Sequence, residues 1–204
     1  CPGGLSCNAL DTEREKGEIA CGYLEGPLRM DEYLLQRLRA AYPPTADPMI
    51  ARALTEGIAL ADDAISGVPL LQTPVGLDLR GHVRRAGAMF AINEYSRRGD
   101  LPFAAAYERQ TRGSWHWLNM TGGGLSAHLV KTPSVAGFPQ DAPTRDDKRL
   151  MNQGDLFDAP RLVDFSSSFG PKARLYAWLA YGCDRAGNIT HALWGIPASD
   201  ADVY

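Results

Sequence analysis

The amino-acid sequence predicts an α+β fold in which a helical N-terminal half packs on antiparallel β-hairpins. Apolar residues recur at helical spacing over residues 31–111, and after Gly113 they alternate with polar residues as in strands. All the predicted helices precede the predicted strands, and this order argues against a doubly wound βαβ sheet. We expect residues 1–29 to be a weakly structured leader and residues 30–204 to form a single domain.

The first two predicted helices carry clear start and stop signals. Asp31 begins a helix that ends before Pro43, and Asp47 followed by Pro48 begins a second one that ends at Gly67. Their apolar residues recur every three or four positions and therefore share one face of each helix. The residues expected to face the core are Leu34, Leu38 and Ala41 in the first helix and Ile50, Leu54, Ile58, Ala61 and Ile65 in the second.

Two more helices are expected before the strands begin. Residues 68–77 are predicted to be a connection, after which a third helix runs from Asp78 to a glycine stop at Gly99. Asp100 is expected to cap a short fourth helix over residues 101–111. The side chains of the third helix that are predicted to face inward are Leu79, Val83, Ala86 and Phe90.

Two β-hairpins are expected, over residues 114–132 and 175–197. Each hairpin joins two runs rich in aromatic and aliphatic residues through a turn that contains glycine. The second hairpin offers so much apolar area that we expect it to belong to the core. Residues 133–172 form a long connection between the hairpins, which we expect to be functional or partly disordered.

The loop lengths predict how the strands pair. A four-residue loop would place Met120 opposite Leu125 in the first hairpin and Leu179 opposite Trp194 in the second. Since side chains alternate across a strand, this pairing gives the second hairpin one apolar face.

The composition is that of an ordinary globular protein. Of 204 residues, 45% are hydrophobic and 22% are charged, and charged residues or Pro interrupt every apolar run short of the ~18 residues that a membrane span needs. Four cysteines without C-x-x-C spacing predict neither a zinc ribbon nor a disulfide scaffold. We therefore expect a cytoplasmic protein of bacterial type.

The middle of the chain is basic although the whole protein has a formal net charge of −3. Residues 80–118 hold seven basic and three acidic side chains. A helix, a turn, a second helix and a hairpin are predicted here, which is the order of elements in a winged helix and favours contact with DNA or RNA. The alternative is that these cations satisfy a helix C-terminus or are ordinary surface charges. The candidate contacts are Arg97, Arg98, Arg109, Arg112 and Lys131.

A short segment of the long connection resembles a known docking motif. Residues 153–157, QGDLF, are similar to the Q-x-[DS]-L-F pentapeptide with which bacterial replication and repair proteins bind the sliding clamp, although Gly154 stands where Leu is common. The resemblance implies that Leu156 and Phe157 enter an apolar pocket of a partner and that Gln153 makes hydrogen bonds beside it. The alternative, which we favour, is that Leu156 and Phe157 fold onto the body of the domain.

No motif identifies a catalytic group. The phosphate loop, the dinucleotide glycine motif and the zincin and hydrolase signatures are absent from the sequence. His116 and His128 are predicted on opposite faces of the first hairpin, where they cannot share a metal ion. The alternative is a one-residue bulge at a glycine, which would place His116 across from His128 as a pair of metal ligands. A metal-dependent phosphodiesterase or nuclease stays an alternative, built on the hairpin histidines and on the loop aspartates Asp146, Asp147, Asp155, Asp158 and Asp164.

The sequence thus favours a binding or regulatory protein over an enzyme, and we expect no cofactor. Its predicted partner is nucleic acid, through the basic middle of the chain, or another protein, through residues 153–157 or the tryptophan-rich hairpins.

Overall fold

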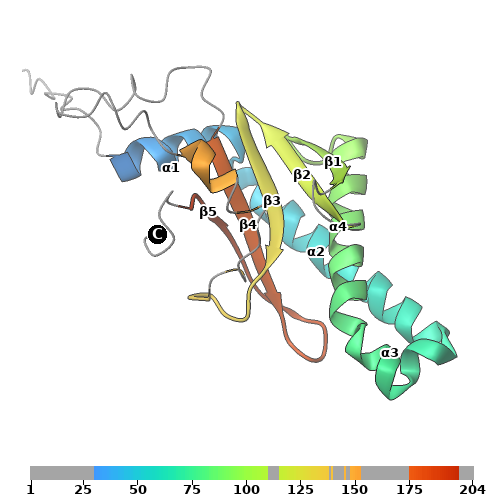
Figure 1. The fold of residues 1–204 in the computed structure, drawn as a ribbon. Helices are drawn as coiled ribbons and strands as arrows, with labels where there is room; N and C mark the ends of the chain where they lie inside the picture. The colour runs from blue at the N-terminus through green and yellow to red at the C-terminus, as the bar shows by residue number, and fades with distance from the viewer. Residues whose placement is uncertain are drawn as a thin grey trace, which may run out of the picture.

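Four α-helices and a five-stranded sheet make up the part of the chain that the structure describes, so the predicted α+β class is confirmed (Figure 1). The structure is a computed structural model that describes residues 30–109, 115–137, 139, 145, 148–152 and 175–197. The helices are α1 (Met30–Ala41), α2 (Asp47–Gly67), α3 (Pro74–Asp78) and α4 (Arg80–Arg98). The strands are β1 (Ala104–Arg109), β2 (His116–Gly122), β3 (Leu125–Lys131), β4 (Leu175–Cys183) and β5 (Ile189–Gly195).

The strands lie in the order β1-β2-β3-β4-β5, so neighbours in the chain are neighbours in the sheet. All the pairings are antiparallel except that of β3 with β4, which is parallel. A parallel pair needs a crossover of about a dozen residues or more. Residues 132–174, between β3 and β4, are long enough to provide it. The two predicted hairpins therefore join edge to edge in one sheet.

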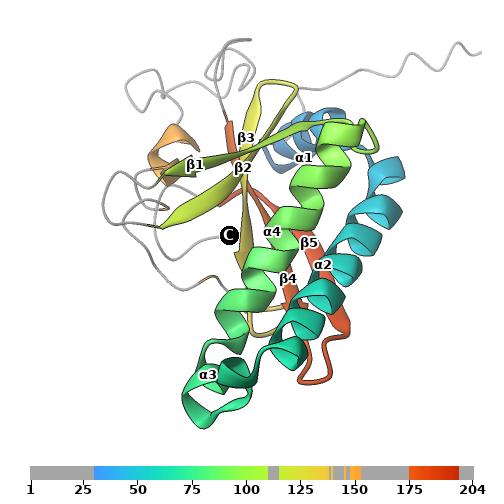
Figure 2. The same ribbon diagram turned by 90° about the vertical axis from the view of Figure 1, so that its right-hand side faces the viewer.

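Helices α2 and α4 cover one face of the sheet, here called the inner face (Figure 2). The 3₁₀ turn η3 (Leu150–Asn152) lies on the opposite, outer face. Tyr42, directly after α1, fixes that helix to the sheet: its ring stacks on Trp194 at 4.1 Å between centroids, and its hydroxyl donates to the backbone oxygen of Met120 at 3.0 Å. None of the described helices is long and apolar enough to cross a membrane.

The first two helices place their apolar stripes as predicted. Leu38 and Ala41 of α1 are buried, and Leu34 packs against the core at partial burial. Every residue of the predicted α2 stripe is buried; these are Ile50, Leu54, Ile58, Ala61 and Ile65. Helical periodicity was sufficient to predict which side of α1 and α2 is buried, because each helix has a single apolar face.

Helices α2 and α4 cross at a pair of glycines. A Cβ atom added at Gly57 would collide with the backbone carbonyl of Gly87, and one added at Gly87 would collide with the carbonyl of Gly57. The helices approach this closely only because neither residue has a side chain. On α4, the buried residues that follow the crossing are small as well, namely Ala88 and Ala91.

We expect Gly87→Ala to destabilise the fold. Alanine favours a helix over glycine by roughly 0.5–1 kcal/mol, but forcing apart a packed contact costs typically 1–3 kcal/mol or more, so the net effect is a loss. The matched control is Gly81→Ala in the same helix, where an added Cβ meets no atom within 4 Å. Urea unfolding should show a lower free energy of unfolding for Gly87→Ala and an equal or higher one for Gly81→Ala; equal values for the two variants would contradict the close crossing.

Of the four residues predicted to face inward from the third helix, three are exposed and Val83 is half-buried. Leu79 and Phe90 are 48% and 47% exposed, and Ala86 is exposed as well. The buried residues of α4 are Arg84, Ala88, Ala91, Ile92 and Tyr95. The close contact at Gly57 leaves no room for a large side chain on the side of α4 that faces α2. The side of α4 with Gly87 is therefore buried, and the side with Leu79 and Phe90 is exposed.

The predicted fourth helix over residues 101–111 is wrong, because residues 104–109 form the edge strand β1. Its register with β2 runs from Ala104 opposite Thr121 to Arg109 opposite His116. Three successive alanines favour a helix locally, but pairing with β2 overrides that preference. The winged-helix order is therefore wrong too, since the element that would enter a DNA groove is a strand. Residues 68–77, predicted to be a connection, contain the 3₁₀ turn η2 (Pro69–Gln72) and the start of α3.

The register of the second hairpin is as predicted up to Gly182, with Leu179 opposite Trp194, and it shifts between Gly182 and Cys183 next to the turn. The first hairpin differs, because Gly122 and not Met120 lies opposite Leu125. Its turn has only two residues, Gly123 and Gly124, with φ angles of 53° and 80°. Two positive φ angles are the requirement of the tight hairpin turn that matches strand twist. The shift is an even number of residues, so each side chain keeps its predicted face.

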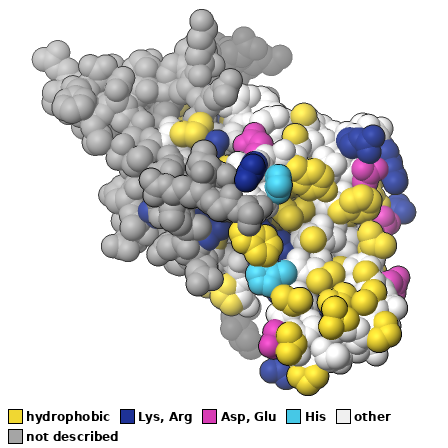
Figure 3. Space-filling model, turned by 45° about the vertical axis from the view of Figure 1, so that its right-hand side comes forward, with side chains coloured by type: hydrophobic (Ala, Val, Ile, Leu, Met, Phe, Trp, Pro, Cys, Tyr) yellow, Lys and Arg dark blue, Asp and Glu magenta, His cyan; other side chains and the backbone are white. Residues whose placement is uncertain are grey.

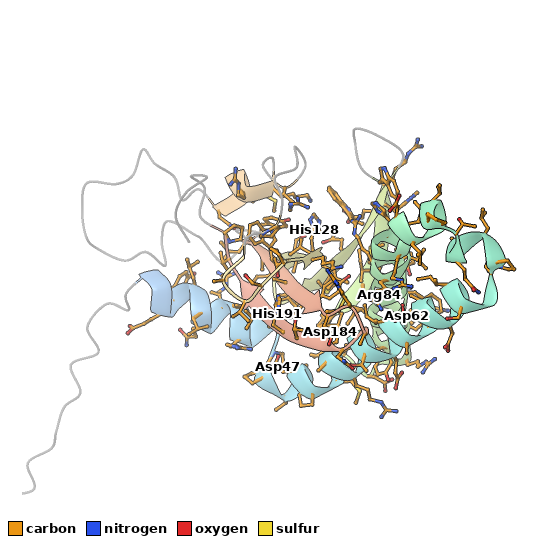
Figure 4. All side chains as sticks on the ribbon, turned by 90° about the horizontal axis from the view of Figure 1, so that it is seen from below. Asp47, Asp62, Arg84, His128, Asp184 and His191 are labelled. Carbon is orange, nitrogen blue, oxygen red and sulfur yellow. The ribbon has the colours of Figure 1, made fainter. Side chains whose placement is uncertain are left out.

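One buried arginine joins both long helices to the second hairpin (Figure 4). Arg84 of α4 is 6% exposed, and its Nε and Nη2 donate to the two carboxylate oxygens of Asp62 in α2 at 2.8 Å each. Its Nη1 and Nη2 also donate to the backbone oxygens of Asp184 and Arg185, in the β4–β5 turn, at 3.0 and 3.1 Å. This side chain therefore positions three elements at once.

We expect Arg84→Ala to destabilise the fold strongly. Removing one partner of a buried ion pair typically costs about 3–5 kcal/mol, because the remaining charge and the two turn carbonyls lose their donors. Arg52→Ala is the matched control, since the Arg52–Glu56 pair on the surface of α2 is exposed and water replaces it. Urea unfolding should show a much lower free energy of unfolding for Arg84→Ala than for Arg52→Ala. A similar small decrease for both variants would show that Arg84 does not hold the turn.

Candidate ligand-binding site

A hydrogen-bonded network of side chains lies on the outer face of β1, β2 and β3. Glu108 accepts a hydrogen bond from the indole Nε1 of Trp117 at 3.2 Å and another from the amide Nδ2 of Asn119 at 2.5 Å. The hydroxyl of Ser126 donates to the amide oxygen of Asn119 at 2.7 Å. The amide is thus held at both ends and its orientation is fixed.

This network borders a pocket of about 510 Å³. Ligand pockets commonly measure roughly 300–1,000 Å³ and place a few polar groups in a defined arrangement. The polar residues of the lining are Glu108, Asn119, Thr121, Ser126 and Lys148, next to the glycines of the β2–β3 turn.

Lys148 brings an ammonium group to this pocket. Its Nζ lies 5.9 Å from the centroid of the Trp117 ring, a distance at which a cation is attracted to the ring face. Within the described part of the chain Lys148 forms no ion pair, and Glu108, across the same pocket, is held by neutral donors only. The pocket therefore holds one positive and one negative group that do not neutralise each other.

His128 lies beside the network, on the same face of β3 (Figure 4). It is 2% exposed, its ring stacks on Trp117 at 4.2 Å between centroids, and its Nδ1 shares a 2.8 Å hydrogen bond with the Tyr176 hydroxyl. Its Nε2 has no hydrogen-bond partner among the described residues. Burial, and to a lesser degree the charges of Lys148, Arg145 and Arg85, lower the pKa of His128 to about 3. The imidazole is therefore neutral at neutral pH.

The predicted nucleic-acid residues that the structure describes lie at the ends of three different elements. Arg97 and Arg98 end α4, where Arg97 pairs with Glu94 at 2.7 Å and Arg98 lies over the Tyr95 ring at 5.9 Å. Arg109 ends β1, five residues beyond its start and therefore about 17 Å along the strand. Exposed Lys131 ends β3, and Arg112 lies outside the described residues. Contact of these residues with nucleic acid stays a prediction.

The segment predicted to dock on a partner, with Gln153, Leu156 and Phe157, lies outside the described residues, as do the five loop aspartates. The residue before this segment, Asn152, has a structural role that the sequence did not reveal. Its amide donates to the backbone oxygens of Tyr176 and Pro197 at 2.9 and 2.7 Å and accepts from the Tyr176 N–H at 2.7 Å. It therefore fixes η3 to β4.

Within the described residues no group of three histidine, cysteine or acidic side chains could hold a metal ion. His116 is exposed on the inner face of the sheet and His128 is buried on the outer face, so the predicted separation of the two imidazoles is confirmed. The network residues Asn119 and Ser126 were not singled out from the sequence. A signal was present, because Asn119, Thr121, Ser126 and His128 all fall on one face of an alternating hairpin, but that face could not be joined to Glu108 while residues 101–111 were predicted to be helical.

Comparisons of the chain with protein-family models, with curated proteins and with solved structures find no match. Any function proposed for it rests on its own residues.

We expect His128 to make the stability of the fold depend on pH. Unfolded His128 binds a proton below its ordinary pKa of 6.5, whereas folded His128 does so only near 3. The unfolded state is therefore favoured as pH falls through this window, and stability is complete above it. Between pH 6.5 and about pH 5 the loss should be roughly 2 kcal/mol.

Urea unfolding at the two pH values should show this loss in the wild type and in His116→Gln, whose imidazole is exposed. The His128→Gln variant should lack it, because no imidazole remains at the buried position. An identical pH dependence in all three proteins would place the titrating group elsewhere.

Proposed function

We propose that the chain is a binding protein whose ligand is a small organic anion, held in the pocket beside Lys148. The observation that carries this proposal is the ammonium of Lys148, which has no ion-pair partner among the described residues, in a pocket of about 510 Å³. A carboxylate or phosphate group of a ligand would supply the missing counter-charge, and a charge-assisted hydrogen bond of this kind is stronger than a neutral one.

The remaining polar groups suit the other parts of such a ligand. Glu108 can accept from a hydroxyl or amino group, because each of its oxygens has a second lone pair free. Its carboxylate also disfavours a ligand that carries negative charge at both ends. A molecule with one anionic group and one hydrogen-bond donor therefore fits best.

The arrangement favours binding over hydrolysis. The Ser126 hydroxyl donates to Asn119, and the hydrogen bond of His128 goes to Tyr176, so these two groups do not form a nucleophile and base pair. Polar groups that are fixed by one another hold a ligand in a defined orientation without further chemistry.

Isothermal titration calorimetry with lactate, inorganic phosphate and a nucleoside monophosphate tests the proposal, with glucose as the uncharged control. We expect at least one anion to bind and glucose not to bind. Lys148→Ala should weaken that binding roughly tenfold to a hundredfold, the worth of one hydrogen bond to a charged group. Lys131→Ala, at the exposed end of β3, is the matched control and should bind as the wild type does. Failure of all three anions to bind, or equal affinity in the two variants, would rule out this site.

A further inference from the structure

The solvent-exposed side of α4 carries apolar residues that no described part of the chain covers. Leu79, His82, Ala86 and Phe90 follow each other at intervals of three and four residues and are all exposed. Such a stripe on the solvent side of a helix is the pattern of a face that packs against another element.

Side chains from other segments widen this stripe. Trp115, 57% exposed, stacks on His82 at 5.5 Å between ring centroids. Tyr107 of β1 is 46% exposed and lies near Glu94; partial burial, and to a lesser degree the Glu94 charge, raises the pKa of the Tyr107 phenol. At the start of α4 the surface continues over η2 and α3 with Leu70, Val75 and Leu77. The hydrophobic side chains gathered where α3 and α4 lie are seen in Figure 3.

The size of this face exceeds that of an ordinary surface patch. Each aromatic residue offers about 150–250 Å², so the exposed halves of Phe90, Tyr107 and Trp115 alone leave roughly 250–400 Å² of apolar surface in water. The largest patch on a typical monomer measures about 300–600 Å². With the aliphatic residues of η2, α3 and Leu79 added, the face approaches the roughly 800 Å² per partner of a standard interface.

We propose that this face binds the same face of a second copy of the chain, with the two α4 helices antiparallel across a twofold axis. The charges along the helix carry this choice. Asp78 and Arg80 lie at its start and Glu94 and Arg97 near its end. An antiparallel pair brings Glu94 of each copy to His82 and Arg80 of the other, and Arg97 to Asp78, whereas a parallel pair would place like charges together.

The same arrangement matches the apolar residues. Ala86 falls opposite Phe90 of the second copy, a small residue against a large one, and this allows the helices to approach. Leu77, before α4, comes to lie near Tyr107 of the second copy, which flanks the other end of the helix. Arg80 and Asp78 form no ion pair within the described residues, and the exposed Arg97–Glu94 pair is easily exchanged for contacts between copies.

Sedimentation velocity over a range of protein concentrations tests the proposal. We expect the wild type to pass from monomer to dimer as the concentration rises, and Phe90→Asp to raise the dissociation constant at least about thirtyfold, the effect of removing a central contact. Leu35→Asp on α1, where Leu35 is also about half exposed, is the matched control and should dimerise like the wild type. Circular dichroism checks that each variant is folded.

A charge exchange distinguishes the antiparallel arrangement from unspecific association. Arg80→Glu and Glu94→Arg should each weaken the dimer, because each creates a like-charged contact, and the double variant should recover it. A wild type that stays monomeric at every concentration, a dimer that Phe90→Asp leaves intact, or a double variant no better than the single ones would each overturn the proposal. The ligand pocket lies on the outer face of the sheet, so neither result depends on the other.

Discussion

The close crossing of α2 and α4 at Gly57 and Gly87 is the constraint on which the rest of the described fold depends. Because the backbones of α2 and α4 are in contact, the rotation of each helix about its own axis is fixed: only the side with the glycine can face the other helix. With α2 turned this way, its stripe from Ile50 to Ile65 faces the core. With α4 turned this way, Phe90 and its apolar neighbours are left on the outside.

Arg84 extends the same constraint to the sheet. It lies three residues before Gly87 and binds Asp62 of α2 and two carbonyls of the β4–β5 turn. A buried ion pair adds little stability over well-packed apolar side chains, because both charges lose their water. Its value here is geometric: a planar guanidinium satisfies partners in fixed directions, so the turn can occupy only one position relative to the helices.

Strand β1 connects the two surfaces to which we assign a role. Successive side chains of a strand point to opposite faces, so Tyr107 joins the apolar face along α4 while Glu108 joins the polar network on the outer face of the sheet. The inner face is largely apolar because the apolar sides of α2 and α4 pack against it, and the Ser96 hydroxyl of α4 bonds to backbone atoms at the start of β1. The outer face keeps Asn119 and Ser126 because they satisfy each other.

The sequence by itself determined the features that depend on neighbouring residues. Helical periodicity and stop signals located α1, α2 and most of α4. The turn in which the Asn188 backbone N–H donates to the Asp184 carboxylate was also located from the sequence, as was the pairing of Leu179 with Trp194. Only the tertiary structure decided which side of α4 is buried, that the alanine-rich residues 104–109 pair as a strand, and that Glu108, Asn119 and Lys148 border one pocket. These outcomes depend on contacts between residues far apart in the chain. The energies of such contacts outweigh local preferences, and the contacts produce no periodic pattern of apolar residues that the sequence would show.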